Sequence, residues 1–205
     1  MSAADRRPLA SRDTAWARRI ASALAHSSVT PNQISTASIL FAALGAWALV
    51  DGRPLALVGA AIAVQLRLLC NLMDGMVAIE GGRQSPTGAL YNEFPDRIAD
   101  SLFLVALGYA CGEPWLGWLA ALLAALTAYV RATGGALGLK QDFRGPMAKP
   151  HRMAVLTAAC LIGAAEMQWN GTRWALLVAA VVIAGGAALT CLTRTLGIAR
   201  ALRER

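Results

Sequence analysis

Residues 54–78 read PLALVGAAIAVQLRLLCNLMDGMVA, a predominantly apolar stretch with a carboxylate, Asp74, near its end. A helix needs about 20 mostly apolar residues to cross a bilayer, so this stretch is long enough to span one. A charged residue within a span is costly and usually faces a bundle interior or a water-filled cavity. We therefore predict a transmembrane helix whose Asp74 face serves a function.

Five further stretches have the same apolar character and are separated by polar connections. Their approximate bounds are 34–50, 90–110, 114–137, 153–167 and 174–192. Apolar residues make up 57% of the 205 residues and charged residues 15%, whereas soluble domains contain about 25% charged residues. The sequence thus predicts an all-α fold, an integral membrane bundle of six transmembrane helices.

The basic residues are distributed unevenly between the connections. Lys and Arg gather in the N-terminal segment, in the connections 80–87 and 138–152 and in the C-terminal tail, whereas the alternate connections carry only Arg53 and Arg173. Cytoplasmic loops carry an excess of Lys and Arg, so both termini are expected in the cytoplasm. This orientation explains the net charge of +7, and no nucleic-acid partner is expected. The Arg-rich and Ala-rich composition indicates a bacterial source, and hence the inner (cytoplasmic) membrane.

The chain divides into three parts on this pattern. Residues 1–32 form a cytoplasmic N-terminal segment, 33–193 the six-span domain and 194–205 a basic cytoplasmic tail. Within the first part, residues 14–25 predict a basic amphipathic helix, with an apolar stripe that includes Ile20 and arginines on the other side. Such a helix lies in the membrane interface.

Amide and carboxylate side chains recur at helical spacing in the second and third predicted spans. Asn71, Asp74 and Ala78 lie at positions i, i+3 and i+7 and share one face of the second span. A second stripe, with i+4 spacing, consists of Gly88, Asn92, Asp96 and Asp100. Carboxylate and amide oxygens are ligands for hard cations such as Mg²⁺, Mn²⁺ or Ca²⁺. Two facing stripes therefore predict a divalent-cation site between the helices.

Two other interpretations of these carboxylates are open. They could form a structural polar network by pairing with Arg67, Arg97 or Arg131. They could also form an ion or proton relay, since intramembrane carboxylates line such pathways. Three Asp residues on two helix faces favour a functional site over the structural network.

Residues 71–96 resemble the signature of the CDP-alcohol phosphatidyltransferase family, D-x2-D-G-x2-A-R-x8-G-x3-D-x3-D. The corresponding residues here read N-x2-D-G-x2-A-I-x8-G-x3-N-x3-D. Residues 30–33 (TPNQ) and the spacing Asp96-Arg97-x-x-Asp100 are also typical of the family. Two further stretches are similar to phosphatidylinositol-phosphate synthase-like members: AYVRA at 128–132 matches their S-Y-x-R-A, and KPHR at 149–152 stands where they have E-R-x-x-R. The resemblance covers most of the chain and implies a six-span bundle.

The sequence departs from the signature at three positions, where Asn71 and Asn92 replace Asp and Ile79 replaces Arg. An Asn carbonyl can ligate Mg²⁺ or Ca²⁺ but brings no charge, so one or two ions remain possible. A gapped match, with Asp96 and Asp100 as the last two signature Asp residues, is a second alignment. The departures also motivate the hypothesis of a catalytically weakened or inactive relative that binds lipid or nucleotide.

The resemblance implies an enzyme of phospholipid biosynthesis that transfers a phosphatidyl group from CDP-diacylglycerol to an alcohol and releases CMP. It also implies Mg²⁺ or Mn²⁺ as cofactor and Asp96 as the catalytic base. The implied metal ligands are Asn71, Asp74, Asn92, Asp96 and Asp100. The residues implied to bind the CDP group are Asp74, Gly75, Ala78 and Gly88.

Three basic residues are candidates for binding the acceptor, namely Arg131, Lys149 and Arg152. Arg clamps phosphate oxygens bidentately, so a phosphorylated acceptor such as glycerol 3-phosphate or inositol phosphate is expected. The charge bias of cytoplasmic loops explains Lys149 and Arg152 about equally well. The resemblance further implies a homodimer, in which small residues such as Gly185 and Gly186 could pack helices.

Overall fold

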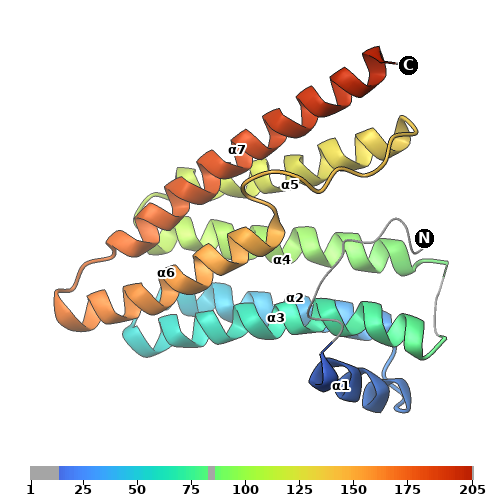
Figure 1. The fold of residues 1–205 in the computed structure, drawn as a ribbon. Helices are drawn as coiled ribbons and strands as arrows, with labels where there is room; N and C mark the ends of the chain where they lie inside the picture. Colours follow the sequence, from blue (N-terminus) through green and yellow to red (C-terminus); the bar gives the residue numbers. More distant parts are fainter. Residues whose placement is uncertain (1–13, 83–85, 205) are drawn as a thin grey trace.

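The computed structural model describes residues 14–82 and 86–204 (Figure 1). These residues form helices joined by turns and loops, and no strand occurs among them. The helices are α1 (Ala15–Ala25), α2 (Pro31–Asp51), α3 (Pro54–Glu80), α4 (Gly88–Ala110), α5 (Pro114–Ala136), α6 (Lys149–Trp169) and α7 (Trp174–Arg203). The predicted all-α fold is confirmed. Arg6, Arg7, Arg12, Arg83 and Arg205, which entered the charge argument, lie outside the described residues.

Local sequence explains where α2 begins and ends. Thr30 caps its N-terminus, because its hydroxyl accepts from the Gln33 amide N–H while the Gln33 side chain accepts from the Thr30 N–H. Pro31 occupies the first turn, where a missing N–H costs nothing. Gly52 ends the helix with a φ of 68°, a left-handed conformation that favours glycine. This turn lets α3 begin two residues later.

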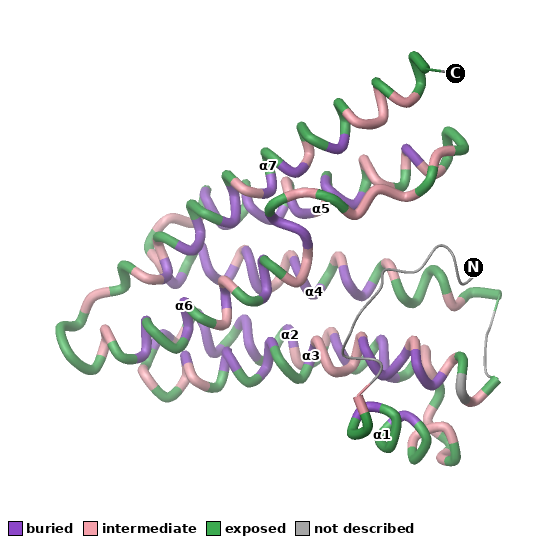
Figure 2. Tube along the Cα trace, viewed as in Figure 1, coloured by how far each residue is buried: buried purple, intermediate pink, exposed green. Residues whose placement is uncertain are grey.

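The six long helices form a closed ring (Figure 1). Helix α2 packs against α3 and α4, α4 against α5, α5 against α7, α7 against α6, and α6 against α3. Short α1 packs on α3 at one end of the ring through Ala17 and Ala21, which are fully buried. Buried positions line the inner faces of the helices, whereas exposed positions follow their outer faces (Figure 2). The polar side chains described below lie within this ring.

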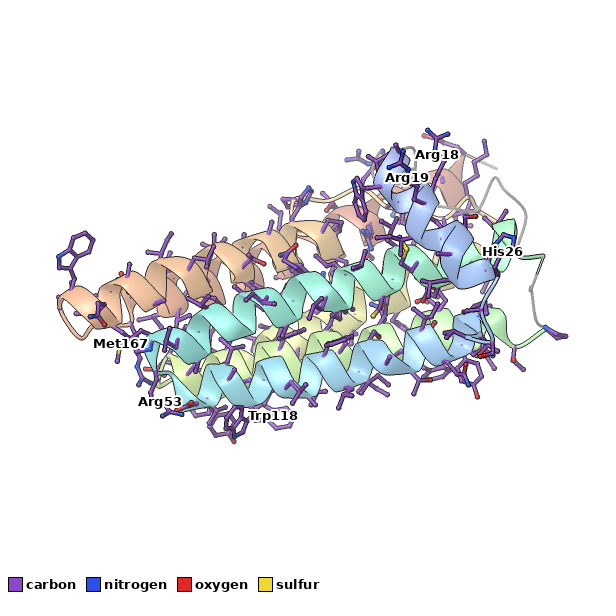
Figure 3. The ribbon with its side chains drawn as sticks, turned by 90° about the horizontal axis from the view of Figure 1, so that it is seen from below. Arg18, Arg19, His26, Arg53, Trp118 and Met167 are labelled. Atoms are coloured by element: carbon purple, nitrogen blue, oxygen red, sulfur yellow. The ribbon has the colours of Figure 1, made fainter. Side chains whose placement is uncertain are left out.

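The two ends of the ring differ in their connections and charge. The connections α2–α3, α4–α5 and α6–α7 lie at one end, and α1, the C-terminal end of α7 and the longer connections lie at the other (Figure 1). Arg18 and Arg19 lie at the second end, whereas Arg53 lies at the first (Figure 3). Both ends of the described chain are therefore on the same side of the bundle.

Four helices are long and apolar enough to cross a membrane, namely α2, α3 over Pro54–Ile79, α5 and α7. Helices α4 and α6 are of similar length but fall short of the same apolar composition. The charged residues of α4 and of the first half of α6 are Glu93, Asp96, Arg97, Asp100, Lys149 and Arg152. The protein is thus a helical membrane protein, and these two helices carry most of its interior charge.

Most helix ends lie within about three residues of the predicted limits, and two boundaries differ by more. Helix α6 begins at Lys149 rather than at 153, because Pro150 in its first turn is compatible with a helix start. Helix α7 continues to Arg203, well beyond the predicted end of the span at 192. Its last turns carry Arg200 and Arg203, and cations are favourable near a helix C-terminus. Most of the expected C-terminal tail is therefore helical.

Candidate functional site

Charged side chains from three helices meet inside the ring and are called the polar centre below. Its members are Arg67 and Asp74 of α3, Asp96 and Asp100 of α4, and Lys149 and Arg152 of α6. All of them except Lys149 are buried. Buried charges are tolerated only when they are paired or bound to a metal, so the partners of each one define what the centre can do.

Asp100 is the structural hub of the polar centre. Its two oxygens accept from two arginines on different helices, Arg67 at 2.7 Å and Arg152 at 2.8 Å. Arg152 also donates to the Met147 carbonyl at 2.9 Å. Because Asp100 is only 2% exposed, these charge-assisted bonds tie α3, α4 and α6 together across the ring.

Asp96 lies one turn before Asp100, and both of its oxygens also accept hydrogen bonds. Its Oδ1 accepts from Arg67 at 3.1 Å and from the amide of Asn71. Its Oδ2 accepts from the Lys149 ammonium, and a guanidinium nitrogen of Arg97 lies 3.8 Å away. Asp96 is thus a carboxylate held between cations, at the point where α3, α4 and α6 face one another.

Asp74 has a different environment from the other two carboxylates. Its Oδ2 accepts from the Ser35 hydroxyl of α2 at 2.6 Å. Its Oδ1 is buried and has no hydrogen-bond partner among the described residues. Asn71, one turn earlier on the same face of α3, bonds to Asp96, and Asp74 is within electrostatic range of Asp96 and Lys149. The two predicted stripes therefore do approach each other at Asn71, Asp74 and Asp96.

The remaining predicted site residues lie farther towards the α1 end of the ring. Gly75 and Ala78 are half-buried on α3, and Gly88 and Asn92 lie in the first turns of α4, where Asn92 is exposed. Gly75 adjoins Asp74 and its backbone N–H acts on that carboxyl, whereas no ion pair or side-chain hydrogen bond among the described residues joins Ala78, Gly88 or Asn92 to the polar centre.

Arg131 of α5 forms a second ionic cluster beside the polar centre. It donates to Glu93 at 2.6 Å and to the Gln141 side chain at 2.7 Å. Its guanidinium also lies 5.2 Å from the centre of the Phe143 ring, within the range of a cation–π contact. Arg131 is therefore held by the 137–148 connection and by α4.

Ser35 and Gln141 contribute to these clusters but were not predicted as site residues. A hydroxyl in an apolar span is the feature that distinguishes Ser35, but serines in helices commonly bond to their own backbone, and Ser35 also donates to the Pro31 carbonyl. Gln141 lies in a loop, where spacing carries no information about contacts. Arg67 and Arg97 were considered only as structural partners, and both do pair with Asp96.

The polar centre offers an oxygen that could ligate a divalent cation at one position. The unpartnered Oδ1 of Asp74 is a buried anionic acceptor, which is a suitable ligand for Mg²⁺ or Mn²⁺. Elsewhere the carboxylate oxygens are engaged by Arg and Lys, and no group of three or more His, Cys, Asp or Glu residues is gathered for a metal in the described part of the chain. Any ion would thus need further oxygens from Asn side chains, water or a phosphate.

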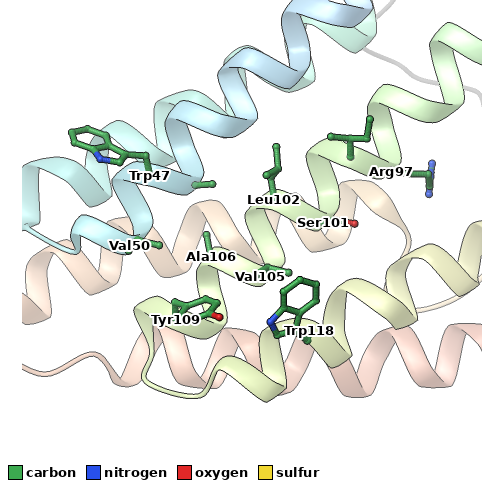
Figure 4. A pocket seen from close by; sticks show the side chains of 11 residues that line it. Trp47, Val50, Arg97, Ser101, Leu102, Val105, Ala106, Tyr109 and Trp118 are labelled. Carbon is green, nitrogen blue, oxygen red and sulfur yellow. The ribbon is translucent and has the colours of Figure 1, made fainter.

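A separate apolar groove of about 660 Å³ runs along the outside of α2, α4 and α5 (Figure 4). Its walls include Trp47, Val105 and Trp118, and only Arg97 connects it with the polar centre. The groove contains no carboxylate, so it is suited to hydrocarbon and not to chemistry on a phosphate. The reactive groups are those of the polar centre.

The fold and the polar centre together define an integral membrane helix bundle with a charged interior site suited to phosphate chemistry. The chain belongs to the CDP-alcohol phosphatidyltransferase family, whose sequence model matches residues 28–192. It therefore belongs to a family of enzymes of phospholipid biosynthesis, as the resemblance of residues 71–96 to the family signature predicted.

Individual relatives agree with this membership. An archaetidylinositol phosphate synthase of Aeropyrum pernix is 35% identical over 188 residues, which cover 90% of this chain and 91% of that protein. The phosphatidylinositol phosphate synthase of Mycobacterium tuberculosis, solved with CDP-DAG bound, has a TM-score of 0.74 at 21% identity and covers 89% of this chain and 92% of its own. Its complex with manganese and citrate has a TM-score of 0.76 at 22% identity, with 89% and 88% covered. At these identities the two solved structures establish the shared fold.

Proposed function

We propose that this protein transfers a phosphatidyl group from CDP-diacylglycerol to a phosphorylated polyol, with release of CMP. The observation that carries the proposal is the position of Asp96, a carboxylate inside the ring that faces Asn71 of α3 and Lys149 of α6. Inositol phosphate is the favoured acceptor class, because an inositol phosphate-type synthase is 35% identical over most of both chains. Glycerol 3-phosphate is the second candidate.

Asp96 acts as the general base in this proposal. It takes the proton of the acceptor hydroxyl, whose oxygen forms a bond to the phosphorus that carries the diacylglycerol. The bond from this phosphorus to the oxygen shared with CMP breaks, and CMP leaves. Asp100, with Arg67 and Arg152, holds α4 so that Asp96 keeps its position.

The CDP group would lie along the Asn71–Asp74 face of α3 and the start of α4. Asp74, with the amides Asn71 and Asn92, would hold a divalent cation, and Asp100 backs Asp96. When bound, Mg²⁺ or Mn²⁺ neutralises pyrophosphate charge and makes CMP a better leaving group. The small residues that would let the nucleotide approach the helices are Gly75, Ala78 and Gly88.

The phosphate of the acceptor would bind beside Asp96, where cations gather. Arg131 and Lys149 are its proposed ligands, since an arginine fork matches phosphate geometry. Arg152 is buried and ion-paired with Asp100. We therefore propose that Arg152 helps to position α4 through Asp100 and does not bind the acceptor phosphate directly. This assignment places the acceptor hydroxyl and the base on the same side of the nucleotide.

We further propose that all six long helices span the membrane, with both termini in the cytoplasm and α1 lying in the interface. Interior charge in α4 and α6 is compatible with spanning because it faces the ring and is paired. Apolar side chains on the outer faces, such as Leu40, Leu122 and Val181, are exposed and would face the lipid. A homodimer would use a free outer face such as that of Gly185, since Gly186 already packs against Met147.

A second candidate function is that of a weakened relative that binds lipid or nucleotide without turnover. It is favoured by Asn71 and Asn92, which replace two signature carboxylates, and by the cations that engage both oxygens of Asp96. The two candidates differ in a single measurable quantity, the release of CMP.

The deciding experiment is a CMP-release assay on purified protein with CDP-diacylglycerol and Mg²⁺ or Mn²⁺. Acceptors to be compared are inositol phosphate, glycerol 3-phosphate, inositol and serine. We expect turnover with a phosphorylated acceptor and a loss of at least about 100-fold in Asp96→Asn, because a general base contributes 10²–10⁴-fold. Asp51→Asn, the same change at the opposite end of the ring, should leave turnover intact. Release of CMP at the same rate in Asp96→Asn would rule out the proposed base, and no release with any acceptor would support the weakened relative.

A further inference from the structure

The cations of the polar centre are shared unequally among its three buried carboxylates. Asp100 is paired with Arg67 and Arg152, and Asp96 with Arg67 and Lys149. Asp74 has no ion pair among the described residues, although it is only 5% exposed. One buried carboxyl group is therefore left without a positive partner.

The free oxygen of Asp74 needs a ligand for a physical reason. A buried acceptor without a partner costs its full desolvation penalty, and the Ser35 hydroxyl satisfies only Oδ2. A divalent cation would supply the missing charge and the missing contact together. Asn71, one turn away, could add an oxygen ligand if its amide turned, but it adds no charge.

Lys149 stands where a cation at Asp96 would have to bind. Its ammonium contacts Oδ2 of Asp96, while Arg67 and Asn71 contact Oδ1. Lys149 is also the first residue of α6, a helix end where a positive side chain is unfavourable. Helix stability therefore does not explain a lysine at this position, whereas the charge of Asp96 does.

We propose that the polar centre binds one divalent ion, at Asp74, and that Lys149 supplies at Asp96 the positive charge that a second ion would otherwise bring. This inference rests on the proposed function, because it concerns the same site, but it makes a separate claim about the number of ions.

The test counts Mn²⁺ ions bound to purified protein in detergent, with free Mn²⁺ measured by electron paramagnetic resonance during a titration. The wild type should bind one ion per chain. Asp74→Asn should lose it, whereas Asp96→Asn should keep it, although the same change should lower turnover at least about 100-fold in the proposed function. Lys149→Met should uncover Asp96 and allow a second ion, whereas Lys149→Arg should still bind one.

Two ions in the wild type, no ion in the wild type, or an ion that survives Asp74→Asn but not Asp96→Asn would each overturn the inference. A single ion in Lys149→Met would overturn the role of the lysine. If Lys149→Met does not elute as a folded species in size-exclusion chromatography, the comparison of Asp74→Asn with Asp96→Asn decides the ion's position. Since ion counting needs no turnover, absence of CMP release would leave this inference standing while refuting the proposed reaction.

Discussion

At the residue scale, three aspartates with the same chemistry have three different environments. Asp100 is held by two arginines, Asp96 by a lysine, an arginine and an amide, and Asp74 by one hydroxyl. A carboxylate paired with two guanidinium groups is suited to a structural role, whereas the carboxylate whose partners include a lysine and an amide is the one proposed as the base. A carboxylate with an open oxygen is suited to bind an ion. Their partners, not their residue type, distinguish their roles.

Asp100→Asn should destabilise the bundle strongly. Removing one partner of a buried ion pair costs about 3–5 kcal/mol, because the other charges remain buried without compensation. For a protein of this size that corresponds to a fall of roughly 10 °C in the apparent Tm, which thermal unfolding in detergent would measure.

Asp142→Asn provides a matched control for the Asp100 variant. Arg144 donates to this loop carboxyl at 3.0 Å and holds the pKa of Asp142 below its usual range, but the Arg144 side chain is 82% exposed. Exposed pairs contribute about 1 kcal/mol or less, so the Tm should move by only a few degrees. Equal losses in the two variants would contradict the structural role assigned to Asp100.

At the scale of the helix, α4 combines a charged half with a half adapted to close packing. Its C-terminal half crosses α5 where two glycines meet, and a Cβ built on Gly108 would lie 2.6 Å from the Cα of Gly117. Small residues at such crossings let membrane helices approach closely. The crossing fixes α4 against α5, and thereby the direction in which Asp96 faces the ring.

Gly108→Val should therefore lower stability by about 1–3 kcal/mol or more, because overpacking forces the backbones apart. The control is Gly59→Val in α3, where an added Cβ meets no atom within 4 Å. We expect a reduced Tm and reduced CMP release in the first variant only. Wild-type behaviour of Gly108→Val would show that the two helices are not in close contact in the membrane.

At the scale of the whole molecule, basic residues gather at one end of the bundle and most of the exposed tryptophans lie towards the other. The α1 end carries Arg18, Arg19, Arg200 and Arg203. Towards the opposite end lie the exposed Trp47, Trp115, Trp118, Trp169 and Trp174, whereas the exposed Trp16 belongs to α1. Trp and Tyr are enriched at both membrane interfaces, whereas Lys and Arg favour the cytoplasmic side, so the basic residues carry the argument on orientation. The distribution supports cytoplasmic termini.

Labelling with a membrane-impermeant thiol reagent tests this orientation. Cys70, Cys111, Cys160 and Cys191 are first replaced by Ala. In spheroplasts with an intact inner membrane, Trp169→Cys should react with the reagent. Arg203→Cys should react only after the inner membrane has been permeabilised. The opposite pattern would mean that the bundle is inverted and that the polar centre opens away from the cytoplasm.

The sequence by itself determined the helices, their approximate limits, the family and the pairing of the Asn71–Asp74 face with the Asp96 face. These features depend on apolar length and on spacing within a single helix, both of which are read along the chain. Only the tertiary structure decided which cation meets which carboxylate. Lys149 and Arg152 reach Asp96 and Asp100 because α6 lies beside α3 in the ring, and the neighbours of a helix follow from the packing of all six, which no spacing within one helix contains.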